Sequence, residues 1–598
     1  MPVRQILPAA LAAACGLSAL GARDAAAQPA ATQAAAAAPP PSAAAAFDSL
    51  VQRHLRDRAR SSPEWATSVG LHTADARLDD RSAAAERRDS VRTAGRRAEL
   101  AAIDTARLDE RRRVDWLLLD AALATALHDA GDRDWQRRAG SYVPFNAVYT
   151  LAVGTTPGPA ARMAALTSRL EAWPAAMALG RRQIDPARTP PLWVELDVAS
   201  ARGIAAYLEG ELPGIVRRSG GDTARFGRAR DAALESLERY TAWMADTLKP
   251  AAHGDWRYGE AAYDWRLRHS KLLDASAASL VDVGHQVFGE TVRELERLAR
   301  EIDPSRSWRE LADSSKGLHP PRDSVLAAYS REAYRARDFI VERGLFTLPP
   351  GERLEMVLTP PNLRQTYAYG GYSPAAPFEK VQVGRFFVTP VDTLADPAAQ
   401  ESKLRGHNYG WITVVALHEG YPGHHLQHAR AAKQPSVLRK VYGSEVFGEG
   451  WGLYAEELMY QAGFYPTPLA RLTQLRMRLW RAARVIIDPS IHTGRMSFDE
   501  AVRFFVDSVG LEKGDATAEV NRYTTWPTQA VSYIVGMREM EALRDTVERR
   551  EGAAFDPARF HDVLLGEGSL PPVLMQRAVL GALERRRPAR ATGSGGHR

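Results

Sequence analysis

The spacing of hydrophobic and polar residues predicts that most of this chain is helical. From Phe47 to about residue 345, apolar residues recur every three or four positions in stretches rich in Ala, Leu, Arg and Glu, which is the period of an amphipathic helix. The same pattern returns between about residues 408 and 583. No internal repeat and no linker separates these segments. They therefore predict a mainly α-helical domain over residues 47–585, either a single body or two lobes around a central cleft.

A different pattern interrupts the helices at about residues 350–392. Here β-branched and aromatic residues lie between Pro and Gly, as in LEMVLTPP and VGRFFVTPV, which is typical of short strands. A small β-sheet is therefore predicted within the helical body. Its segment Val383–Val388 could offer a free strand edge to an extended peptide.

The first 46 residues are predicted to be an export signal followed by a spacer. Residues 1–27 have a basic start, an apolar run and small residues before Ala27, as in a cleaved signal peptide. The apolar run is too short and too rich in Pro and Gly for a stable transmembrane span. We therefore expect an exported protein, periplasmic or secreted, with a lipoprotein anchored through Cys15 as the less favoured alternative. Residues 28–46 read as an Ala/Pro-rich disordered spacer, and residues 586–598 as a flexible basic tail.

Charge and cysteine content restrict the chemistry. The chain has 78 basic and 72 acidic residues, a formal net charge of +6, which is too small over this length to indicate nucleic-acid binding. Its single cysteine, Cys15, is lost with the predicted signal peptide. Disulfides and Cys-ligated metals are thereby excluded in the mature protein, so any metal site must use His and carboxylates.

The densest chemical signal is the segment VVALHEGYPGHHLQH, which begins at Val414. In the short zinc-hydrolase helix, two histidines lie one turn apart and a Glu follows the first, ready to take a proton from water. His418 and Glu419 match that start, but the next histidine, His424, comes six positions later. On a continuous helix it would lie about 9 Å along the axis and on another side.

Pro422 and Gly423 explain how two histidines six positions apart could still bind one metal. Proline removes a backbone donor and clashes with the preceding turn, and glycine tolerates unusual dihedral angles, so the helix must break or bulge here. A redirected turn could then return His424 to the same metal as His418. His425 is the competing second ligand. His428 is expected on the next turn as a polar group outside the ligand set.

A third metal ligand is predicted in the segment FGEGWGLYAEEL. Glu449 lies there among three glycines, which are poor helix formers and indicate that another backbone or a substrate approaches closely. Glu449 is the expected third ligand. Glu456, seven residues further on a similar helix face, could orient a ligating histidine; a solvated helix face is the alternative for it.

Taken together, these motifs resemble the bacterial DUF885 family, which is similar to the helical gluzincin peptidases. The resemblance is strong over about residues 370–536 and looser in the helical N-terminal half. It rests on four blocks: His418 to Gln427; Gly448, Glu449, Gly450 and Trp451 with Tyr454 and Glu456; Arg484, Asp488 and His492; and Arg522 and Tyr523 with Pro527, Gln529, Ala530, Tyr533 and Gly536.

The resemblance implies a mainly α, gluzincin-like fold with a long central cleft. It also implies one Zn²⁺ ion held by His418, His424 and Glu449, and hydrolysis of peptide bonds. In one respect the chain departs from the pattern, because helical gluzincins usually carry an acidic residue four positions after the metal-binding Glu. That position is Leu453 here, so other residues must form the hydrogen bonds that orient the metal ligands.

Further site residues follow from the chemistry of zinc hydrolysis. Glu419 is the expected general base. An oxyanion needs a hydrogen-bond donor besides the metal, and Tyr533 is the first candidate. His492 is the second, with Asp488 one turn earlier as its orienting partner. Arg522 and Tyr523 could hold a substrate carboxylate or main chain, or form a structural ion pair.

The sequence therefore predicts a zinc metallopeptidase, an oligopeptidase or exopeptidase acting on a peptide substrate. Two alternatives remain: a zinc amidase acting on cell-wall peptides, and a non-catalytic peptide-binding protein of the cell envelope. The second would have no need of Glu419 beside His418. Phosphate-loop, serine-nucleophile and cysteine-framework motifs are absent from the sequence.

Overall fold

The computed structural model describes residues 41–360, 364 and 369–585. The predicted signal peptide, the spacer up to residue 40 and the predicted basic tail lie outside the described residues. No helix within the described ranges is both long enough and apolar enough to cross a membrane. The first helix begins at Ala43, slightly before the predicted start at Phe47, because Ala43–Ala46 is a run of the strongest helix former.

Helices build the first half of the chain, as its apolar periodicity predicts. Their buried faces carry the periodic residues, for example Phe47, Leu50 and Leu55 in the first helix. The helices are α1 (Ala43–Ser61), α2 (Pro63–Ser68), α3 (Ala83–Ala101), α4 (Glu110–Asp132), α5 (Phe145–Val153), α6 (Pro159–Glu171), α7 (Trp173–Gln183), α8 (Pro191–Glu209), α9 (Leu212–Arg218), α10 (Thr223–Trp243), α11 (Lys249–Ala251), α12 (Glu260–Trp265), α13 (Ala277–Ile302), α14 (Trp308–Ser315) and α15 (Val325–Glu342).

The predicted sheet is present and has three strands, β1 (Leu354–Leu358), β2 (Gly370–Ser373) and β3 (Gly384–Val388). Their order is β1-β3-β2, with β1 parallel and β2 antiparallel to β3. β3 is therefore the central strand, and both of its edges are already paired. The expectation that Val383–Val388 offers a free edge to a peptide is wrong, because the order of strands in a sheet is set by packing and not by sequence order.

The second half of the chain is again helical. Its helices are α16 (Pro397–Gly406), α17 (Tyr409–Glu419), α18 (His424–Ala431), α19 (Val437–Val441), α20 (Glu445–Gln461), α21 (Pro468–His492), α22 (Phe498–Phe504), α23 (Lys513–Thr525), α24 (Ser532–Glu551), α25 (Pro557–Gly566) and α26 (Pro572–Arg585). α16 precedes the predicted restart at 408. Its start carries a recognisable signal, since the side chain of Asp396 accepts from the backbone N–H of Ala399 and Pro397 is the first helical residue.

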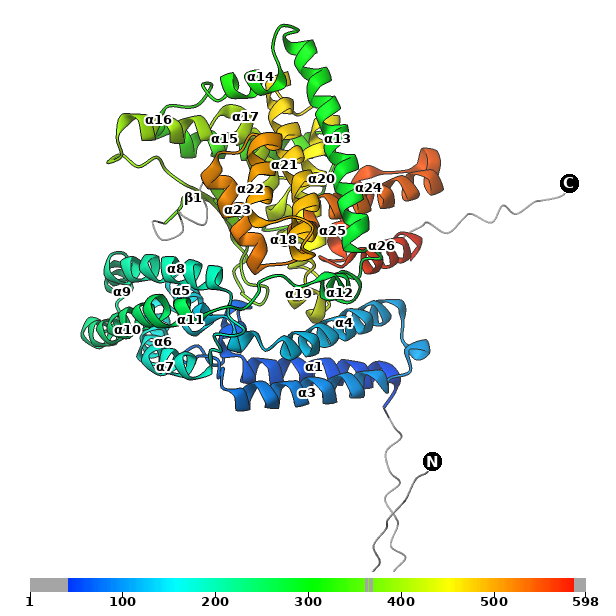
Figure 1. Cartoon of the computed structure of the whole chain (residues 1–598). Coiled ribbons are helices and arrows are strands. Elements are labelled where there is room, and N and C mark those ends of the chain that lie inside the picture. The colour runs from blue at the N-terminus through cyan, green and yellow to red at the C-terminus, as the bar shows by residue number, and fades with distance from the viewer. Residues whose placement is uncertain (1–40, 361–363, 365–368, 586–598) are drawn as a thin grey trace, which may run out of the picture. The chain divides into compact units, whose positions relative to one another are not determined.

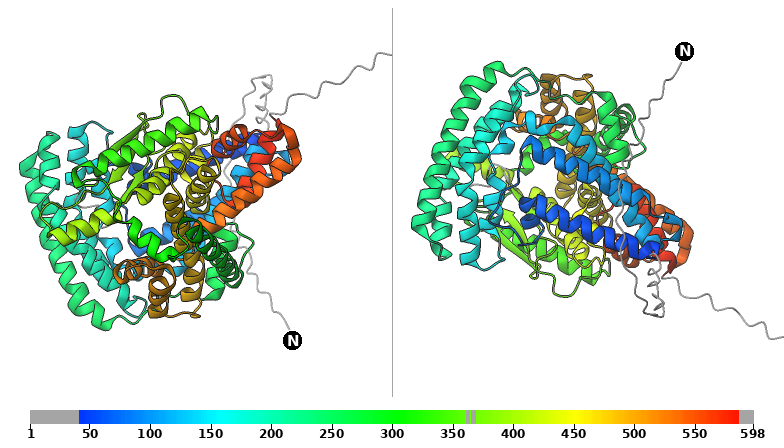
Figure 2. Two further views of the ribbon diagram at one scale, coloured as in Figure 1. Left: turned by 90° about the horizontal axis from the view of Figure 1, so that it is seen from above. Right: turned by 90° about the horizontal axis from the view of Figure 1, so that it is seen from below.

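Two large hydrophobic cores, with two smaller ones along α21, organise these elements. The larger core joins α1, α3 and α4 with the sheet and most C-terminal helices. A separate core, including Tyr142, Trp173 and Tyr240, lies within residues 139–252. This segment contains α5 to α10, which Figures 1 and 2 show to one side of α20–α24. At the centre, α21 packs along α13 and α20 packs along α24. α21 is buried over most of its length, so the predicted functional residues lie on well-supported helices.

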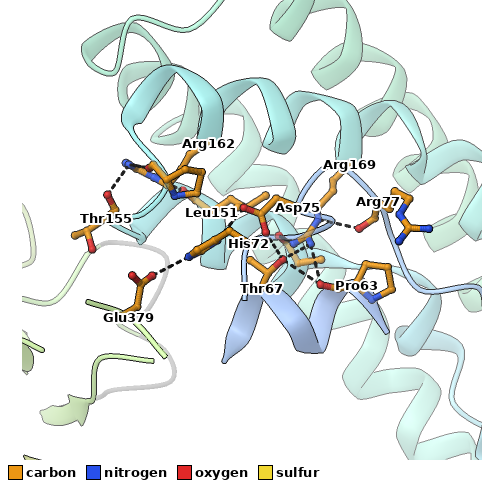
Figure 3. A network of polar contacts seen from close by, with 12 residues as sticks. Pro63, Thr67, His72, Asp75, Arg77, Leu151, Thr155, Arg162, Arg169 and Glu379 are labelled. Atoms are coloured by element: carbon orange, nitrogen blue, oxygen red, sulfur yellow. Dashed lines mark hydrogen bonds and ion pairs between the residues drawn. The ribbon is translucent and has the colours of Figure 1, made fainter. Parts of the chain in front are cut away.

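The loop between β2 and β3 is tied to the N-terminal helices by a polar network (Figure 3). Nδ1 of His72 lies 2.8 Å from Asp75 Oδ2, and its Nε2 lies 3.0 Å from Glu379 Oε1. The backbone N–H of Phe378 also donates to the carbonyl oxygen of Val69. Beside this contact, the fully buried Arg169 donates to backbone carbonyls and to the Thr67 hydroxyl. These contacts hold the loop between β2 and β3 against the N-terminal part of the chain.

Candidate metal centre

The predicted helix break separates α17 from α18. α17 ends at Glu419 and α18 begins at His424, with a cis peptide bond between Tyr421 and Pro422. A Cβ atom at Gly423 would lie 2.0 Å from the carbonyl oxygen of His418, so this tight turn accepts only glycine. The indole N–H of Trp451, on α20, donates to the carbonyl oxygen of Pro422 at 2.9 Å. The turn that redirects His424 is thus held from a neighbouring helix.

This turn brings His418 and His424 together with Glu449 of α20. Oε2 of Glu449 lies 3.8 Å from Nε2 of His418 and 3.7 Å from Nε2 of His424. The two imidazole rings are nearly perpendicular, with centroids 4.7 Å apart. One ligand atom from each of the three residues lies within 4.8 Å of the others. This is the donor set predicted from the sequence, and it is of the kind that catalytic zinc sites use.

Hydrogen bonds fix the direction of both imidazoles. Nδ1 of His418 lies 2.8 Å from Oε1 of Glu456, and Nδ1 of His424 lies 3.1 Å from Oε1 of Gln427. The Gln427 side chain is oriented in turn, since its Nε2 donates to Oγ of Ser569. Both acceptors call for a proton on Nδ1, so in the neutral form of each ring Nε2 is the atom left to bind a metal beside Glu449. Glu456 has the place predicted for it, whereas Gln427 had no predicted role.

The ionisation of the three residues reflects their contacts. Burial alone would raise the pKa of Glu449, but the two imidazoles lower it well below the ordinary value. Burial would likewise lower the pKa of His418, but the carboxylates of Glu449 and Glu456 raise it to about 9. The group therefore concentrates negative charge around two imidazoles, which is an electrostatic environment that attracts a cation.

The glycines around Glu449 are explained by close contacts. A Cβ atom at Gly452 would lie 2.3 Å from Cε1 of His418, so the His418 ring packs directly on the backbone of α20. A Cβ atom at Gly450 would lie 2.4 Å from Cα of Gly536 on α24. The inference that another backbone approaches these glycines is confirmed at Gly450. This close crossing of α20 and α24 also determines what lies beside Glu449.

Glu419, the predicted general base, is the last residue of α17 and directly follows His418. Its side chain is half-buried. Within the described ranges, no side chain forms a hydrogen bond or an ion pair with its carboxylate. A carboxylate beside a histidine pair and without a partner of its own is free to accept a proton from a ligand.

His425 and His428 do not join the group. Nε2 of His425 lies 2.7 Å from Glu352 Oε2, and its Nδ1 lies 3.2 Å from the Tyr372 hydroxyl. Both of its ring nitrogens are therefore engaged away from Glu449, which favours His424 as the second ligand. His428 lies one turn further along α18, where its ring stacks on Tyr372.

Tyr533 lies close to Glu449 because α24 crosses α20 at Gly536, one helical turn after Tyr533. Burial raises the pKa of Tyr533, and the negative charge of Glu449 raises it further. The guanidinium of Arg484 stacks on its ring, with Cζ 4.5 Å from the ring centroid. Its hydroxyl has no hydrogen-bond partner among the described residues, so it can donate to a ligand.

His492 and Asp488 are placed elsewhere. The His492 ring is fully buried among Trp256, Tyr258 and Tyr263, and its Nε2 donates to the carbonyl oxygen of Tyr523 at 3.0 Å. Burial lowers its pKa to about 4. Nε2 of His492 is 3.9 Å from Oδ1 of Asp488, too far for a hydrogen bond.

The reason is the length of α21. His492 lies eight residues after Arg484, which is about 12 Å along the helix axis, and there the helix faces α12 and not α20. Asp488 instead accepts from the Tyr263 hydroxyl and from the backbone N–H of Thr528. The expectations that His492 assists at the metal and that Asp488 orients it are therefore not supported by the geometry.

Arg522 and Tyr523 belong to a network around Glu519, which had no predicted role. Oε2 of Glu519 accepts from Arg484 at 3.0 Å, from Arg522 at 3.3 Å and from the Tyr523 hydroxyl at 2.5 Å. Although burial opposes it, the two guanidinium groups lower the pKa of Glu519 to about 2. Tyr523 is 1% exposed, so it supports the network and is not open to a substrate.

A second group of possible metal ligands occurs on α4 and comprises His128, Asp129 and Asp132. The guanidinium of Arg266 lies 2.7 Å from Asp129 and 3.6 Å from Asp132. The charge of these carboxylates is thus already balanced by the protein, which makes this group a poor candidate for a metal.

Comparisons with known proteins agree with the family resemblance. The family model described as "Bacterial protein of unknown function (DUF885)" matches residues 63–579. A candidate lipoprotein of unknown function from Shewanella oneidensis is 22% identical, with a TM-score of 0.76 over 90% of this chain and 100% of its own. A candidate lipoprotein from Colwellia psychrerythraea is 17% identical, with a TM-score of 0.77 over 91% and 100% of the two chains. No curated protein matches the chain. The two solved structures share its mainly helical fold.

Proposed function

This chain belongs to the DUF885 family, and we propose that it is a zinc-dependent hydrolase that cleaves peptide bonds. One observation carries the proposal. His418 and His424 turn their Nε2 atoms towards Glu449, and the charge of Glu419, which has no hydrogen-bond partner among the described residues, acts on both imidazoles. A binding site for metal alone would need the first three residues but not the fourth.

The donor set fits zinc. Two imidazole nitrogens and one carboxylate are the ligands of a catalytic zinc site, which keeps a further position open for water or substrate. Hydrogen bonds from Nδ1 of both histidines complete the arrangement that such sites require. When bound, zinc supplies Lewis acidity, which makes a water more acidic and a carbonyl carbon more electrophilic.

Residues of the protein would carry out the proton transfer and stabilise the negative charge that develops. Glu419 accepts the proton of the attacking water and passes it to the amine nitrogen that leaves. The Tyr533 hydroxyl donates a hydrogen bond to the oxygen that becomes negatively charged on the former carbonyl. Glu456 and Gln427 keep the two imidazoles in position throughout.

We also propose that the protein is exported. The N-terminal sequence supports this, because it combines a basic start, an apolar run and small residues before Ala27. The descriptions of both similar structures as candidate lipoproteins support the same location. Peptides of the cell envelope would then be available as substrates.

The proposal is tested by metal analysis and peptide hydrolysis on the purified mature protein. About one zinc per chain and cleavage of peptides in a mixed library are expected. A chelator should abolish cleavage and added zinc should restore it, because zinc ligation by two imidazoles and a carboxylate is reversible. If the protein binds zinc but leaves every peptide of the library intact, the proposed hydrolase activity is wrong.

The choice between the adjacent histidines gives a sharper prediction. His424→Ala is expected to weaken zinc binding by more than the roughly 10–100-fold that loss of a supporting hydrogen bond causes, because a direct ligand is removed. His425→Ala should bind zinc almost as the wild type does, since its ring nitrogens contact Glu352 and Tyr372. Titration with a competing chelator measures both affinities. The reverse ranking would make His425 the ligand.

A further inference from the structure

Two arginines beside the candidate metal centre depend on a single carboxylate for their hydrogen-bonded ion pairs. Arg484 of α21 and Arg522 of α23 both donate to one carboxylate, that of Glu519. The Tyr523 hydroxyl donates to the same oxygen. Two guanidinium groups therefore share one hydrogen-bonding carboxylate, whereas the charges of Glu449 and Asp488 act on them without a hydrogen bond.

Other carboxylates nearby are already occupied. Asp488 accepts from Tyr263 and from the backbone of Thr528, not from an arginine. Glu456 holds His418, and its charge acts on a further buried arginine, Arg481, whose Nε has no hydrogen-bond partner among the described residues. A buried guanidinium without a hydrogen-bonded carboxylate of its own is costly, so a site that keeps one is suited to an anion.

The two arginines that share Glu519 adjoin the proposed reaction site. Arg484 stacks on the ring of Tyr533, and Tyr533 lies next to Glu449 at the crossing of α20 and α24. The side chain of Arg522 is 30% exposed, whereas that of Arg484 is 7% exposed. Arg522 is therefore the arginine that a bound molecule can reach, with Arg484 behind it.

We propose that Arg522, backed by Arg484, binds a carboxylate of the peptide substrate, and that this carboxylate is the free C-terminus. The inference rests on the proposed peptidase function and specifies its substrate class, peptides cut near their C-terminal end. A planar guanidinium can bind a carboxylate through two hydrogen bonds. The Nη1 group of Arg522 now donates to Gln529 at 2.5 Å, an amide that a charged ligand can displace.

Binding to the inactive Glu419→Gln protein loaded with zinc tests the inference without hydrolysis. One N-acetylated peptide sequence is prepared as the free acid, as the C-terminal amide, and as an amide with an added internal Glu. Calorimetry should show that the free acid binds about 10–100-fold more tightly than the plain amide. This ratio corresponds to the free energy that a charge-assisted hydrogen bond contributes to binding. Tight binding of the Glu-containing amide instead would make an acidic side chain the ligand and overturn the C-terminal assignment.

Arginine variants made in the same background complete the test. Arg522→Gln should remove the preference for the acid, and Arg522→Lys should keep part of it because the charge remains. Arg225→Gln is the matched control, since Arg225 is also partly exposed and paired with one carboxylate, Glu171, on α6. Equal affinity for acid and amide, or an unchanged preference in Arg522→Gln, would overturn the carboxylate site.

Hydrolysis by the wild type separates this inference from the proposed function. Cleavage of both acid and amide at similar rates would support the peptidase function and refute the carboxylate site. Acid-selective binding without any cleavage by the wild type would refute the peptidase and leave the carboxylate site standing.

Discussion

Replacing Glu419 with Gln is expected to lower kcat for peptide hydrolysis by about 10²–10⁴-fold, the usual contribution of a general acid–base group. Glutamine has nearly the shape of glutamate, but its amide cannot accept the proton of the attacking water. Zinc binding should be unchanged, because the ligand atoms come from His418, His424 and Glu449. Turnover of a cleaved peptide and zinc content per chain are measured on the same preparation.

The control for this variant is Glu401→Gln. Glu401 lies on α16, its side chain is 54% exposed and its Oε1 lies 3.1 Å from Nε2 of His319, so the same chemical change occurs away from the site. The Glu401→Gln variant should hydrolyse peptides at the wild-type rate. Wild-type turnover in Glu419→Gln itself would exclude Glu419 as the base and would move that role to another group.

Gly452→Ala is expected to disturb the metal centre although residue 452 contacts no ligand atom through a side chain. The added Cβ would lie 2.3 Å from Cε1 and 2.8 Å from Nε2 of His418, far inside van der Waals contact, so the ring or α20 must move. We expect zinc affinity to fall by at least the roughly 10–100-fold that loss of ligand orientation costs. Overpacking should also lower the free energy of unfolding by about 1–3 kcal/mol.

Gly448→Ala on the same helix is the matched control. A Cβ at Gly448 would meet only Nε2 of Gln427, at 3.6 Å, which is ordinary contact. This variant should retain zinc and gain up to about 1 kcal/mol of stability from the higher helix propensity of alanine. Chelator titration and thermal unfolding compare the two variants. If both keep wild-type zinc affinity, the packing of His418 on α20 does not control ligation.

Local sequence was sufficient to propose the metal ligands. The donors of His418 and His424 come from one segment of the chain, and Pro422 and Gly423 dictate that the helix breaks between them. The glycines at 450 and 452 similarly revealed a close approach before its partners were known. The mainly helical class and the sheet near residues 350–392 were also predictable, because both follow from the period of apolar residues.

Contacts between distant segments were not predictable in the same way. Asp488 and His492 are correctly spaced to face each other on a helix, yet the end of α21 faces α12 and buries His492 among aromatic rings. Glu519 is an ordinary helical glutamate in the sequence, and only the packing of α23 against α21 places it between Arg484 and Arg522. The order of the three strands is a further case.

The sequence by itself thus determined the helical class, the break after Glu419 and the residue types of a candidate metal site, because these depend on backbone preferences and spacing within short segments. Only the tertiary structure decided that Glu449 meets both histidines, that His425 turns to Glu352, and that two arginines share Glu519. Those outcomes depend on which helix faces meet, and that is set by burial of apolar surface over the whole domain, which no local segment specifies.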